Sequence, residues 1–558
     1  GKVDFEKLQQ VLGEYVEDSN ERYNFTWNGK GRALRLSQTP SLGTLRPCKE
    51  ESKDWDTTQN LYIEGDNLEV LKLLQKSYHG KVKMIYIDPP YNTGKDFVYP
   101  DDFHDSLENY KKLTGQVDNE GNRISTNTEA SGRYHTDWLN MMYPRLRLAR
   151  NLLTDDGAIF VSIDEHEHST LKSIMDEIFG EANYVDSVVW DKKSSAKGVP
   201  PRNMMVNVHE YIVVYQRSDK FKFIGEERNE ESDGFKNPDN DPRGPWRESN
   251  IKSTTKPIED AFTIVDPNTG REYTNTWAFS KESLEKMIRE ERILWKDTLP
   301  KQKEFMREMT NENKAIKSNW GVFDAQSTTV YLKNLITEVK FDNPKPLNLM
   351  KYLLKVVVKG NDIVFDFFSG SGTTGDALMQ LNAEDGGNRK FIMVQLPEPT
   401  DNPKFVNICE IGKERIRRAG EMIKEEKGLE AQNLDIGFKV LKLDTSNIRK
   451  WQPDYDNLEQ SLEDFIDNYV EGRTELDVVY EIMLKYGLDL TYPVDEFTVA
   501  QKKVYSIGFG MLIICLDNEI TTEVAKGILE KVKELAPEST RVVFKDNGFK
   551  TDSNKTNI

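Results

Sequence analysis

Two stretches of the chain alternate short apolar strands with amphipathic helices, and this alternation constrains the fold more than any other feature of the sequence. In the first stretch, strands are predicted at residues 61–63, 82–87 and 157–163, with helices at 68–74 and 138–153 between them. Strands and helices that alternate along a chain typically pack as a largely parallel sheet covered by helices. The sequence therefore predicts an α/β protein.

The second stretch resumes this pattern after a long interruption. Helices and strands are predicted in turn at 347–357, 362–368, 375–381, 390–396 and 407–424. Residues from about 191 to 330 contain one apolar strand, at 209–216, and are otherwise rich in Pro, Asn, Asp, Gly and Trp, which indicates an inserted module. Five regions are predicted: an N-terminal segment (1–60), a first core part (61–190), the inserted module (191–330), a second core part (331–440) and a C-terminal region (441–558).

The composition excludes several classes of protein. The chain has 558 residues, a net charge of −18 and no apolar run of the length, about 18 residues, that spans a membrane. Its first residues lack the apolar run of a secretory signal, and three scattered cysteines exclude a disulfide framework or a cysteine-built zinc site. We therefore expect a soluble, cytoplasmic protein. Residues 191–330 hold 24 basic and 24 acidic side chains, which permits DNA binding if the basic ones share a face.

A glycine-rich turn lies between the predicted strand at 362–368 and the helix that follows it. Gly370, Gly372 and Gly375 satisfy the pattern G-x-G-x-x-G, in which glycines permit a tight turn and the close approach of a ligand. A loop of purely structural glycines would give the same pattern, so the glycines alone do not identify the ligand.

The acidic residues near this turn favour S-adenosylmethionine over a nicotinamide cofactor. Asp366, just before the glycines, suits a ligand with an ammonium group, which S-adenosylmethionine has and NAD lacks. A dinucleotide site would also need an acid at the end of the next strand to hold the ribose hydroxyls. This chain has Gln395 there, with Glu398 slightly beyond.

The second motif is Asp88-Pro89-Pro90-Tyr91, at the end of a predicted buried strand. Sheets of this class bind ligands at the carboxyl ends of their strands. A carboxylate and a neighbouring carbonyl oxygen can both accept hydrogen bonds from an exocyclic amine, which directs the nitrogen lone pair towards an electrophile. The prolines hold these acceptors rigid, and the tyrosine ring offers a face on which a flat base can stack.

Together the two motifs resemble those of DNA amino-methyltransferases, and the chain is similar to the modification (Mod) subunits of type III restriction–modification systems. In that family Asp-Pro-Pro-Tyr precedes the target-recognition region, which precedes Phe-x-Gly-x-Gly. The same order is found here in residues 88–91, 191–330 and 368–372. Four further segments resemble the two ends of the family, at 23–30, 51–58, 475–488 and 542–557.

The resemblance implies a fold, a reaction and partners. The fold is a Rossmann-like methyltransferase sheet with circularly ordered motifs, an inserted target-recognition domain at 191–330 and a small C-terminal α+β interaction domain at 441–558. The reaction is N6-methylation of a flipped adenine in double-stranded DNA, with S-adenosylmethionine as cofactor and no metal. The partners are a second copy of the chain, as a homodimer, and a restriction (Res) subunit that carries a helicase-like motor and a nuclease.

The resemblance also implies a role for each motif residue. The catalytic residues are Asp88, Pro89, Pro90 and Tyr91. The cofactor-binding residues are Asp66 for the adenine, Asp366 for the methionine part, Lys345 in the segment that closes the pocket, Phe368, Ser369, Gly370 and Gly372 for the ribose and the backbone wall, and Thr373 and Thr374 at the start of the helix. Gln395 departs from the acid that many methyltransferases carry at the ribose, and Glu398 is a substitute.

Two alternatives stay open at this point. The first is a stand-alone DNA amino-methyltransferase, for N6 of adenine or N4 of cytosine, without a nuclease partner. The aspartate at the first motif position disfavours cytosine, because cytosine enzymes usually carry serine there. The second is a nicotinamide-dependent oxidoreductase, which would give no role to residues 88–91.

Other polar and aromatic features are given structural roles. The metal-like sequence at 164–168, Asp-Glu-His-Glu-His, is expected to form a solvated loop, and the basic residues at 413–418 are expected to form a solvated helix face. Trp190 is expected to pack in the core. Four tryptophans are expected to form the core of the inserted module: Trp246, Trp277, Trp295 and Trp320.

Overall fold

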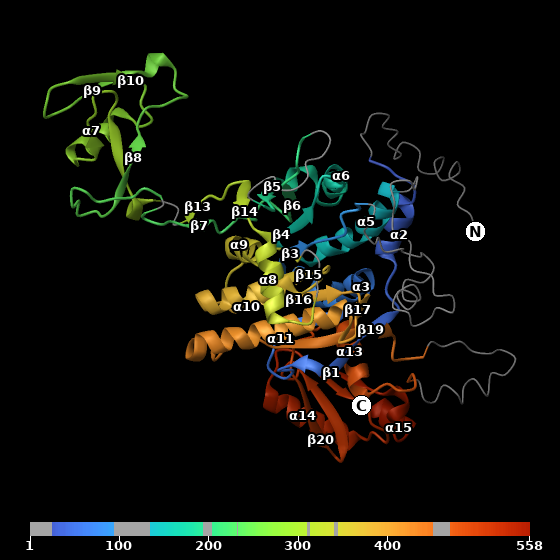
Figure 1. Cartoon of the computed structure of the whole chain (residues 1–558). Helices are drawn as coiled ribbons and strands as arrows, with labels where there is room; N and C mark the ends of the chain where they lie inside the picture. The colour runs from blue at the N-terminus through green and yellow to red at the C-terminus, as the bar shows by residue number, and fades with distance from the viewer. Residues whose placement is uncertain are drawn as a thin grey trace, which may run out of the picture. The chain divides into compact units, whose positions relative to one another are not determined.

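The computed structural model describes residues 25–93, 134–193, 204–231, 233–309, 313–339, 344–449 and 469–558. The chain divides into two compact units (Figure 1), of which the larger comprises Gly1–Lys222 with Ser318–Ile558 and the smaller comprises Phe223–Lys317. The first 24 residues of the predicted N-terminal segment lie outside the described residues.

The larger unit is built on one ten-stranded sheet, in the order β1-β19-β2-β16-β15-β3-β4-β6-β5-β14. Its strands are β1 (Gly43–Lys53), β2 (Leu61–Glu64), β3 (Val82–Ile87), β4 (Leu153–Ile163), β5 (Tyr184–Asp191), β6 (His209–Gln216), β14 (Asn319–Val322), β15 (Ile363–Asp366), β16 (Lys390–Gln395) and β19 (Phe438–Thr445). The six central strands, from β19 to β4, are mutually parallel. Strands β1 and β6 pair antiparallel at the two sides of this block. The predicted α/β sheet is confirmed.

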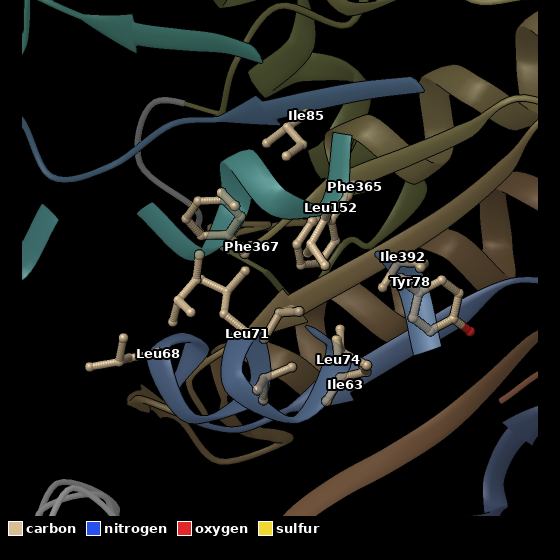
Figure 2. Packing of buried hydrophobic residues seen from close by; sticks show 14 of the residues in the cluster. Ile63, Leu68, Leu71, Leu74, Tyr78, Ile85, Leu152, Phe365, Phe367 and Ile392 are labelled. Carbon is tan, nitrogen blue, oxygen red and sulfur yellow. The ribbon is translucent and has the colours of Figure 1, made fainter. Parts of the chain in front are cut away.

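Helices cover the sheet. They are α2 (Lys30–Gln38), α3 (Asn67–Tyr78), α5 (Tyr134–Leu152), α6 (His168–Phe179), α8 (Ala325–Leu335), α9 (Leu347–Val357), α10 (Thr373–Asp385) and α11 (Ile408–Lys427). Those at α3, α5, α9, α10 and α11 coincide with predicted helices, whereas α2 and α8 were not predicted. Alternate strand residues such as Ile85, Phe365 and Ile392 share one buried cluster with α3 and α5 (Figure 2). Met393, which points the other way, packs against α10 near Gly375. Period-two burial of this kind requires helices on both faces of the sheet.

The C-terminal region adds a helix and a small sheet to the larger unit. These are α13 (Glu475–Tyr486), α14 (Thr522–Leu535), α15 (Asp552–Asn557) and the sheet of β20 (Val494–Val499), β21 (Lys502–Ile507), β22 (Leu512–Cys515) and β23 (Arg541–Phe544). Tyr505 and Ile514 on one face of this sheet join the main core, whereas Val504 and Ile513 on the other face pack with α14. The predicted domain start at 441 falls inside β19 of the large sheet.

The smaller unit has its own core around Trp277, which is fully buried. Its elements are β7 (Glu226–Glu227), β8 (Trp246–Asn250), β9 (Phe262–Val265), β10 (Glu272–Asn275), α7 (Lys281–Arg289), β11 (Ile293–Leu294), β12 (Lys301–Phe305) and β13 (Asn313–Lys314). The unit lies inside the segment 191–330 that is predicted to recognise the DNA target. Two segments at the ends of 191–330 belong to the large sheet instead, β6 and β14, and β14 pairs with β5.

One tryptophan assigned to the inserted module lies elsewhere. Trp320 is on β14 and packs against Tyr352 of α9, with ring centroids 5.1 Å apart, so its placement in the module core is wrong. Trp277 and Trp295 do contribute to the core of the smaller unit. In the part of the chain that the structure describes, no helix is both long and apolar enough to cross a membrane. Two small hairpin strands, β17 (Pro399–Asn402) and β18 (Phe405–Asn407), complete the larger unit.

Candidate active site

The two sequence motifs meet between β15 and β3, where the order of strands in the sheet changes direction. Strands β15 and β3 are parallel neighbours, and the chain passes from β15 to β16 on one side and from β3 to β4 on the other. Asp366 is the last residue of β15, and Asp88 directly follows β3. Ligands of open α/β sheets bind outside the carboxyl ends of the strands at such a reversal. The topology therefore places both motifs at the expected ligand site.

A cavity of about 620 Å³ opens at this edge and is lined by residues of both motifs. Its size is that of a typical small-molecule site. Of the predicted residues, the lining includes Asp88, Pro89, Pro90, Tyr91, Lys345, Phe368, Gly370, Gln395 and Glu398. The remaining predicted residues are not in the lining and are all buried: Asp66, Asp366, Ser369, Gly372, Thr373 and Thr374.

Asp366 is a buried carboxylate that receives hydrogen bonds from uncharged donors. The Thr374 hydroxyl donates to its Oδ2 at 2.6 Å, and the Phe368 N–H donates to its Oδ1 at 3.1 Å. Burial raises the pKa of Asp366 to about 7, although these two hydrogen bonds lower it in part and the charge of Asp88 adds to the increase. A cation that entered here would favour the ionised form.

The glycine turn after Asp366 has a backbone that side chains would not tolerate. Gly370 and Gly372 have φ of 51° and 81°, in the left-handed region that favours glycine. A Cβ on Gly372 would also lie 3.1 Å from the carbonyl oxygen of Gly412 on α11. Gly372 is the N-cap of α10 and supplies no side-chain cap, so the first N–H groups of this helix can bind an anion.

Gln395 braces the same turn. Its Oε1 accepts a hydrogen bond from the Gly370 N–H at 2.8 Å, and its Nε2 donates to the Leu396 carbonyl at 3.3 Å. The residue at the predicted ribose position therefore has a contact of its own with the glycine loop. Glu398, the predicted substitute, lies on the rim of the cavity.

Asp66 is held by the protein itself. It is the N-cap of α3, and its Oδ1 accepts from the N–H groups of Leu68 and Glu69. Its Oδ2 lies 3.2 Å from Nη2 of Arg145, a fully buried residue of α5. These bonds fix the start of α3 beside the glycine motif, because the neighbouring Asn67 donates to the Phe367 carbonyl at 2.7 Å. The assignment of Asp66 to the cofactor adenine stays a prediction.

On the other side of the cavity, Lys345 connects the acidic residues around Tyr91. Its Nζ lies 3.3 Å from Oδ1 of Asp88 and 2.7 Å from Oε2 of Glu210, and it donates to the Tyr91 hydroxyl. The Tyr91 hydroxyl in turn donates to Glu210 at 3.1 Å. Burial raises the pKa of Asp88, and Lys345 offsets part of that increase. Burial would likewise raise the pKa of Glu210, but Lys345 and Lys192 outweigh it and the pKa is lowered.

Glu210 is a site residue that the sequence reasoning missed. It lies near the start of β6, and its side chain is only 11% exposed. The signal was a single acidic residue at the head of an otherwise apolar strand, His-Glu-Tyr-Ile-Val-Val-Tyr. A buried acid in such a strand needs a cationic partner, and Lys345 could not be identified as that partner because it lies 135 residues away.

Trp190 lines the same cavity while being almost fully buried. Its ring centroid lies 5.8 Å from Nζ of Lys345, and its Nε1 has no hydrogen-bond partner. Trp190 therefore packs in the core, as expected, and also forms part of the cavity wall. An indole that packs against the core and also faces the cavity can form a rigid wall beside Tyr91.

The expectation of a solvated face for the basic helix is wrong for two residues of α11. Lys413 is buried and pairs with both Glu51 and Glu64. Arg415 is fully buried, pairs with Asp376 at 2.8 Å and donates to the hydroxyls of Ser371 and Thr373. Because it reaches behind the glycine turn, Arg415 holds the turn in place and is not available to DNA.

The expected solvated loop at 164–168 is wrong at two positions, because Asp164 and Glu167 are buried. Glu167 is fully buried, where it accepts hydrogen bonds from Asn92 at 2.6 Å and from His135 at 2.7 Å. Asp164, Glu165 and His166 are close enough together to bind an ion, but exposed acidic groups commonly cluster without one. The site at the end of β3 and β15 therefore remains the main functional candidate.

The comparisons with known proteins agree with this geometry. Residues 82–421 match the family described as DNA methylase. The chain is 33% identical to the EcoP15I Mod subunit, a type III restriction–modification enzyme of Escherichia coli, over 98% of this chain and 90% of the relative. It is 32% identical to the EcoPI Mod subunit of Escherichia phage P1 over the same shares. The chain belongs to the Mod subunits of type III restriction–modification enzymes, within the DNA methylase family.

This membership confirms the predicted family and the predicted enzyme class, a DNA methyltransferase, and excludes the nicotinamide-dependent oxidoreductase. Solved structures also match the chain, among them the M1.HpyAVI–SAM complex, with 15% identity and a TM-score of 0.30 over 64% of this chain and 98% of that one. At that TM-score the likeness adds nothing to what the strand order already establishes.

Proposed function

We propose that this Mod subunit is a site-specific adenine-N6 DNA methyltransferase that takes its methyl group from S-adenosylmethionine. The observation that carries the proposal is the meeting of Asp88-Pro89-Pro90-Tyr91 and the glycine turn in one cavity, in a chain that belongs to the DNA methylases. The alternative, a stand-alone methyltransferase, is less well supported, because the relatives that match 98% of the chain are type III Mod subunits.

The base side of the cavity orients the target amine. The Asp88 carboxylate and the Pro89 carbonyl oxygen accept hydrogen bonds from the two N–H groups of adenine N6, which leaves the lone pair directed at the methyl group. Tyr91 stacks on the base, which must leave the duplex to reach the cavity. Positioning accounts for most of the rate, because the neutral thioether that the sulfonium becomes when it loses its methyl group is a good leaving group. The proton can leave the amine after the transfer, so no strong base is needed.

The cofactor side fits S-adenosylmethionine. Asp366 is a buried carboxylate with no cationic side chain among the partners described above, so the ammonium of the methionine part can pair with it. The start of α10, with Thr373 and Thr374, binds the methionine carboxylate. Phe368, Ser369, Gly370 and Gly372 form the wall, Asp66 meets the adenine, and Gln395 or Glu398 meets the ribose. The cofactor supplies the electrophilic methyl group.

The partners follow from the family and stay part of the proposal. The substrate is double-stranded DNA, and the segment 191–330, which contains the separate smaller unit, recognises its sequence. A restriction (Res) subunit with a motor and a nuclease joins the chain, as implied by relatives that are type III enzymes. The chain pairs with a second copy, and the segment 441–558 contributes to self-association or to binding of the Res subunit.

Base-resolved modification mapping tests the function directly. DNA from cells that express the chain is expected to carry N6-methyladenine at one recurring sequence, and DNA from cells that express Asp88→Ala is expected to lack it. N4-methylcytosine at a recurring sequence would show that the target base is cytosine and not adenine. Unmodified DNA from cells with folded protein would contradict the proposal.

A further inference from the structure

The ammonium of Lys345 stands where the proposed mechanism needs the target amine. Its Nζ is 3.3 Å from Oδ1 of Asp88, a distance at which a cation pairs with the carboxylate that would hold adenine N6. The same Nζ donates to the Tyr91 hydroxyl and lies 4.7 Å from the ring centroid, which places it at the hydroxyl edge of the ring on which the base would stack. Base and ammonium therefore compete for one carboxylate oxygen, that of Asp88.

Glu210 holds this ammonium more closely than Asp88 does. Oε2 of Glu210 is 2.7 Å from Nζ of Lys345, against 3.3 Å for Asp88. The Tyr91 hydroxyl donates to the same Oε2, and Lys192 lies 3.3 Å from the other oxygen, Oε1. Glu210 is thus fixed by three contacts from different parts of the chain. It can keep Lys345 paired after Asp88 has been taken by another partner.

We propose that Lys345 is a placeholder for the target amine and that Glu210 is the positioning residue that retains it when the base enters. The inference rests on the proposed function. A half-buried carboxylate with no partner is unfavourable, so Asp88 benefits from a cation while the cavity lacks a base. When adenine N6 arrives, Lys345 shifts fully to Glu210, and neither the carboxylate nor the ammonium is left without a partner.

This arrangement predicts opposite effects for the two members of the pair. With Glu210→Gln, Lys345 keeps Asp88 as its remaining anionic partner among the residues that contact it, so the base must separate a tighter pair. With Lys345→Met, the base has no cation to displace and enters more readily. In a Lys345→Met background, Glu210→Gln has nothing left to act on, so the double variant behaves as Lys345→Met does.

The test is a double-mutant cycle on base entry, measured without cofactor. The probe is a duplex with 2-aminopurine at the methylated position found by modification mapping, because the fluorescence of this base rises when it leaves the stack. We expect Glu210→Gln to lower the equilibrium constant for base extrusion roughly tenfold in the wild-type background. We expect Lys345→Met to raise it, and the double variant to equal Lys345→Met within about twofold, the ordinary limit of additivity.

The matched control is the surface pair of Lys351 and Glu384, which links α9 to α10 away from the cavity. Lys351→Met and Glu384→Gln should leave extrusion unchanged. Thermal melting and circular dichroism report whether each variant is folded, and Lys345→Gln replaces Lys345→Met if the latter does not fold.

Two outcomes overturn the inference. If Glu210→Gln lowers extrusion by the same factor with and without Lys345, Glu210 acts on the base or on the fold and not through the lysine. If Lys345→Met lowers extrusion, the lysine binds the base or the DNA and does not compete with it. A wild-type protein that methylates and extrudes the base but shows no coupling overturns this inference alone, whereas a wild type that does neither overturns the proposed function.

Discussion

Asp88 and Asp366 are the same residue type at the ends of neighbouring parallel strands, yet their surroundings differ in kind. The side chain of Asp88 is 30% exposed and lies in an ionic cluster with Lys345 and Glu210. Asp366 is 3% exposed and accepts hydrogen bonds from the Thr374 hydroxyl and the Phe368 N–H, both uncharged donors. The difference corresponds to the ligands we propose. Asp366, which we propose binds the cationic ammonium of the cofactor, has no cationic partner among its described contacts, whereas Asp88, which we propose binds a neutral amine, is paired with Lys345.

The two carboxylates also influence each other. The charge of Asp88 contributes to the raised pKa of Asp366, and Lys345 acts in the opposite direction on Asp88. A cationic cofactor between them would relieve this repulsion. The comparison therefore predicts that substitutions on the base side affect the reaction, and that substitutions on the cofactor side affect binding.

The largest effect is expected from Asp88→Ala. This change removes the acceptor for the target amine, so methyl transfer should fall by about 10³-fold or more, as for the loss of a central polar group in other active sites. The affinity for S-adenosylmethionine should stay within a few-fold. Transfer of a radioactive methyl group to duplex DNA and calorimetry of cofactor binding measure the two effects.

Asp156→Ala is the matched control, because Asp156 pairs with Lys83 at the far end of β3, with a side chain that is 55% exposed. It should change neither quantity. A variant Asp88→Ala that methylates DNA at the wild-type rate would remove Asp88 from the mechanism. A variant that loses cofactor binding instead would show that the two sides of the cavity are not separable.

The sequence predicted these two carboxylates but not what surrounds them. Asp88 and Asp366 were found because each follows an apolar strand, and strand ends of a parallel sheet meet at one edge. Lys345 was assigned to the cofactor pocket by resemblance, and it lines the cavity together with Phe368 and Gly370. Its polar contacts with Asp88, Tyr91 and Glu210 were not predicted. Pairings between residues far apart in sequence have no local pattern, so they could not be derived before the fold was known.

The second effect, on the cofactor side, is expected from Asp366→Asn. The amide oxygen can still accept the hydrogen bond from the Phe368 N–H, and the amide NH2 can donate to the Thr374 hydroxyl, but the neutral amide cannot pair with an ammonium group. A charge-assisted hydrogen bond contributes about 1.5–3 kcal/mol, so the affinity for S-adenosylmethionine should fall by roughly 10- to 100-fold. Calorimetry measures this loss, and methylation at saturating cofactor should recover most of the wild-type rate. An unchanged affinity would exclude Asp366 from the cofactor site.

The raised pKa of Asp366 makes the same interaction depend on pH. Without ligand the pKa is about 7, above its ordinary value of 3.8, and a bound ammonium favours the ionised carboxylate and lowers it. Binding therefore releases a proton below pH 7, so the affinity of the wild type should rise with pH up to about 7 and then level off. Asp366→Asn should lack this rise, and a parallel pH profile for both proteins would assign the proton to another group.

The C-terminal region shows what burial patterns leave undetermined. Apolar residues of α13 such as Val479 and Met483 were expected to be buried, but the sequence could not tell against which surface. They join the main core, and Asp477 of the same helix pairs with Arg46 of β1 at 3.1 Å. An amphipathic helix specifies that one face is covered, whereas the covering surface depends on how the rest of the chain folds.

A smaller effect is expected from the stacking residue. Tyr91→Ala removes the ring, and stacking of a base on an aromatic side chain contributes about 1–3 kcal/mol, so methylation should fall roughly tenfold. Tyr91→Phe keeps the ring and loses the hydroxyl contacts with Glu210 and Lys345, so it should fall only a few-fold. Steady-state rates on duplex DNA compare the two variants. Equal losses would indicate that the hydroxyl, and not the ring, carries the function of Tyr91.

The smallest effect is expected from Gln395→Glu, which tests the ribose position. The Gly370 N–H donates to Oε1 of Gln395, and a glutamate oxygen can accept the same bond, so the glycine turn should keep its shape. The new carboxylate would lie near the ribose hydroxyls, where an acid is favourable, but also near Glu398 on the cavity rim, which opposes a second charge. The two effects oppose each other, so the affinity for S-adenosylmethionine should change less than about threefold.

Gln395→Leu is the matched comparison: it removes the acceptor, and should therefore weaken binding by loosening the Gly370 backbone. If Gln395→Glu weakened binding as much as Gln395→Leu, the amide itself would be the group that the site requires.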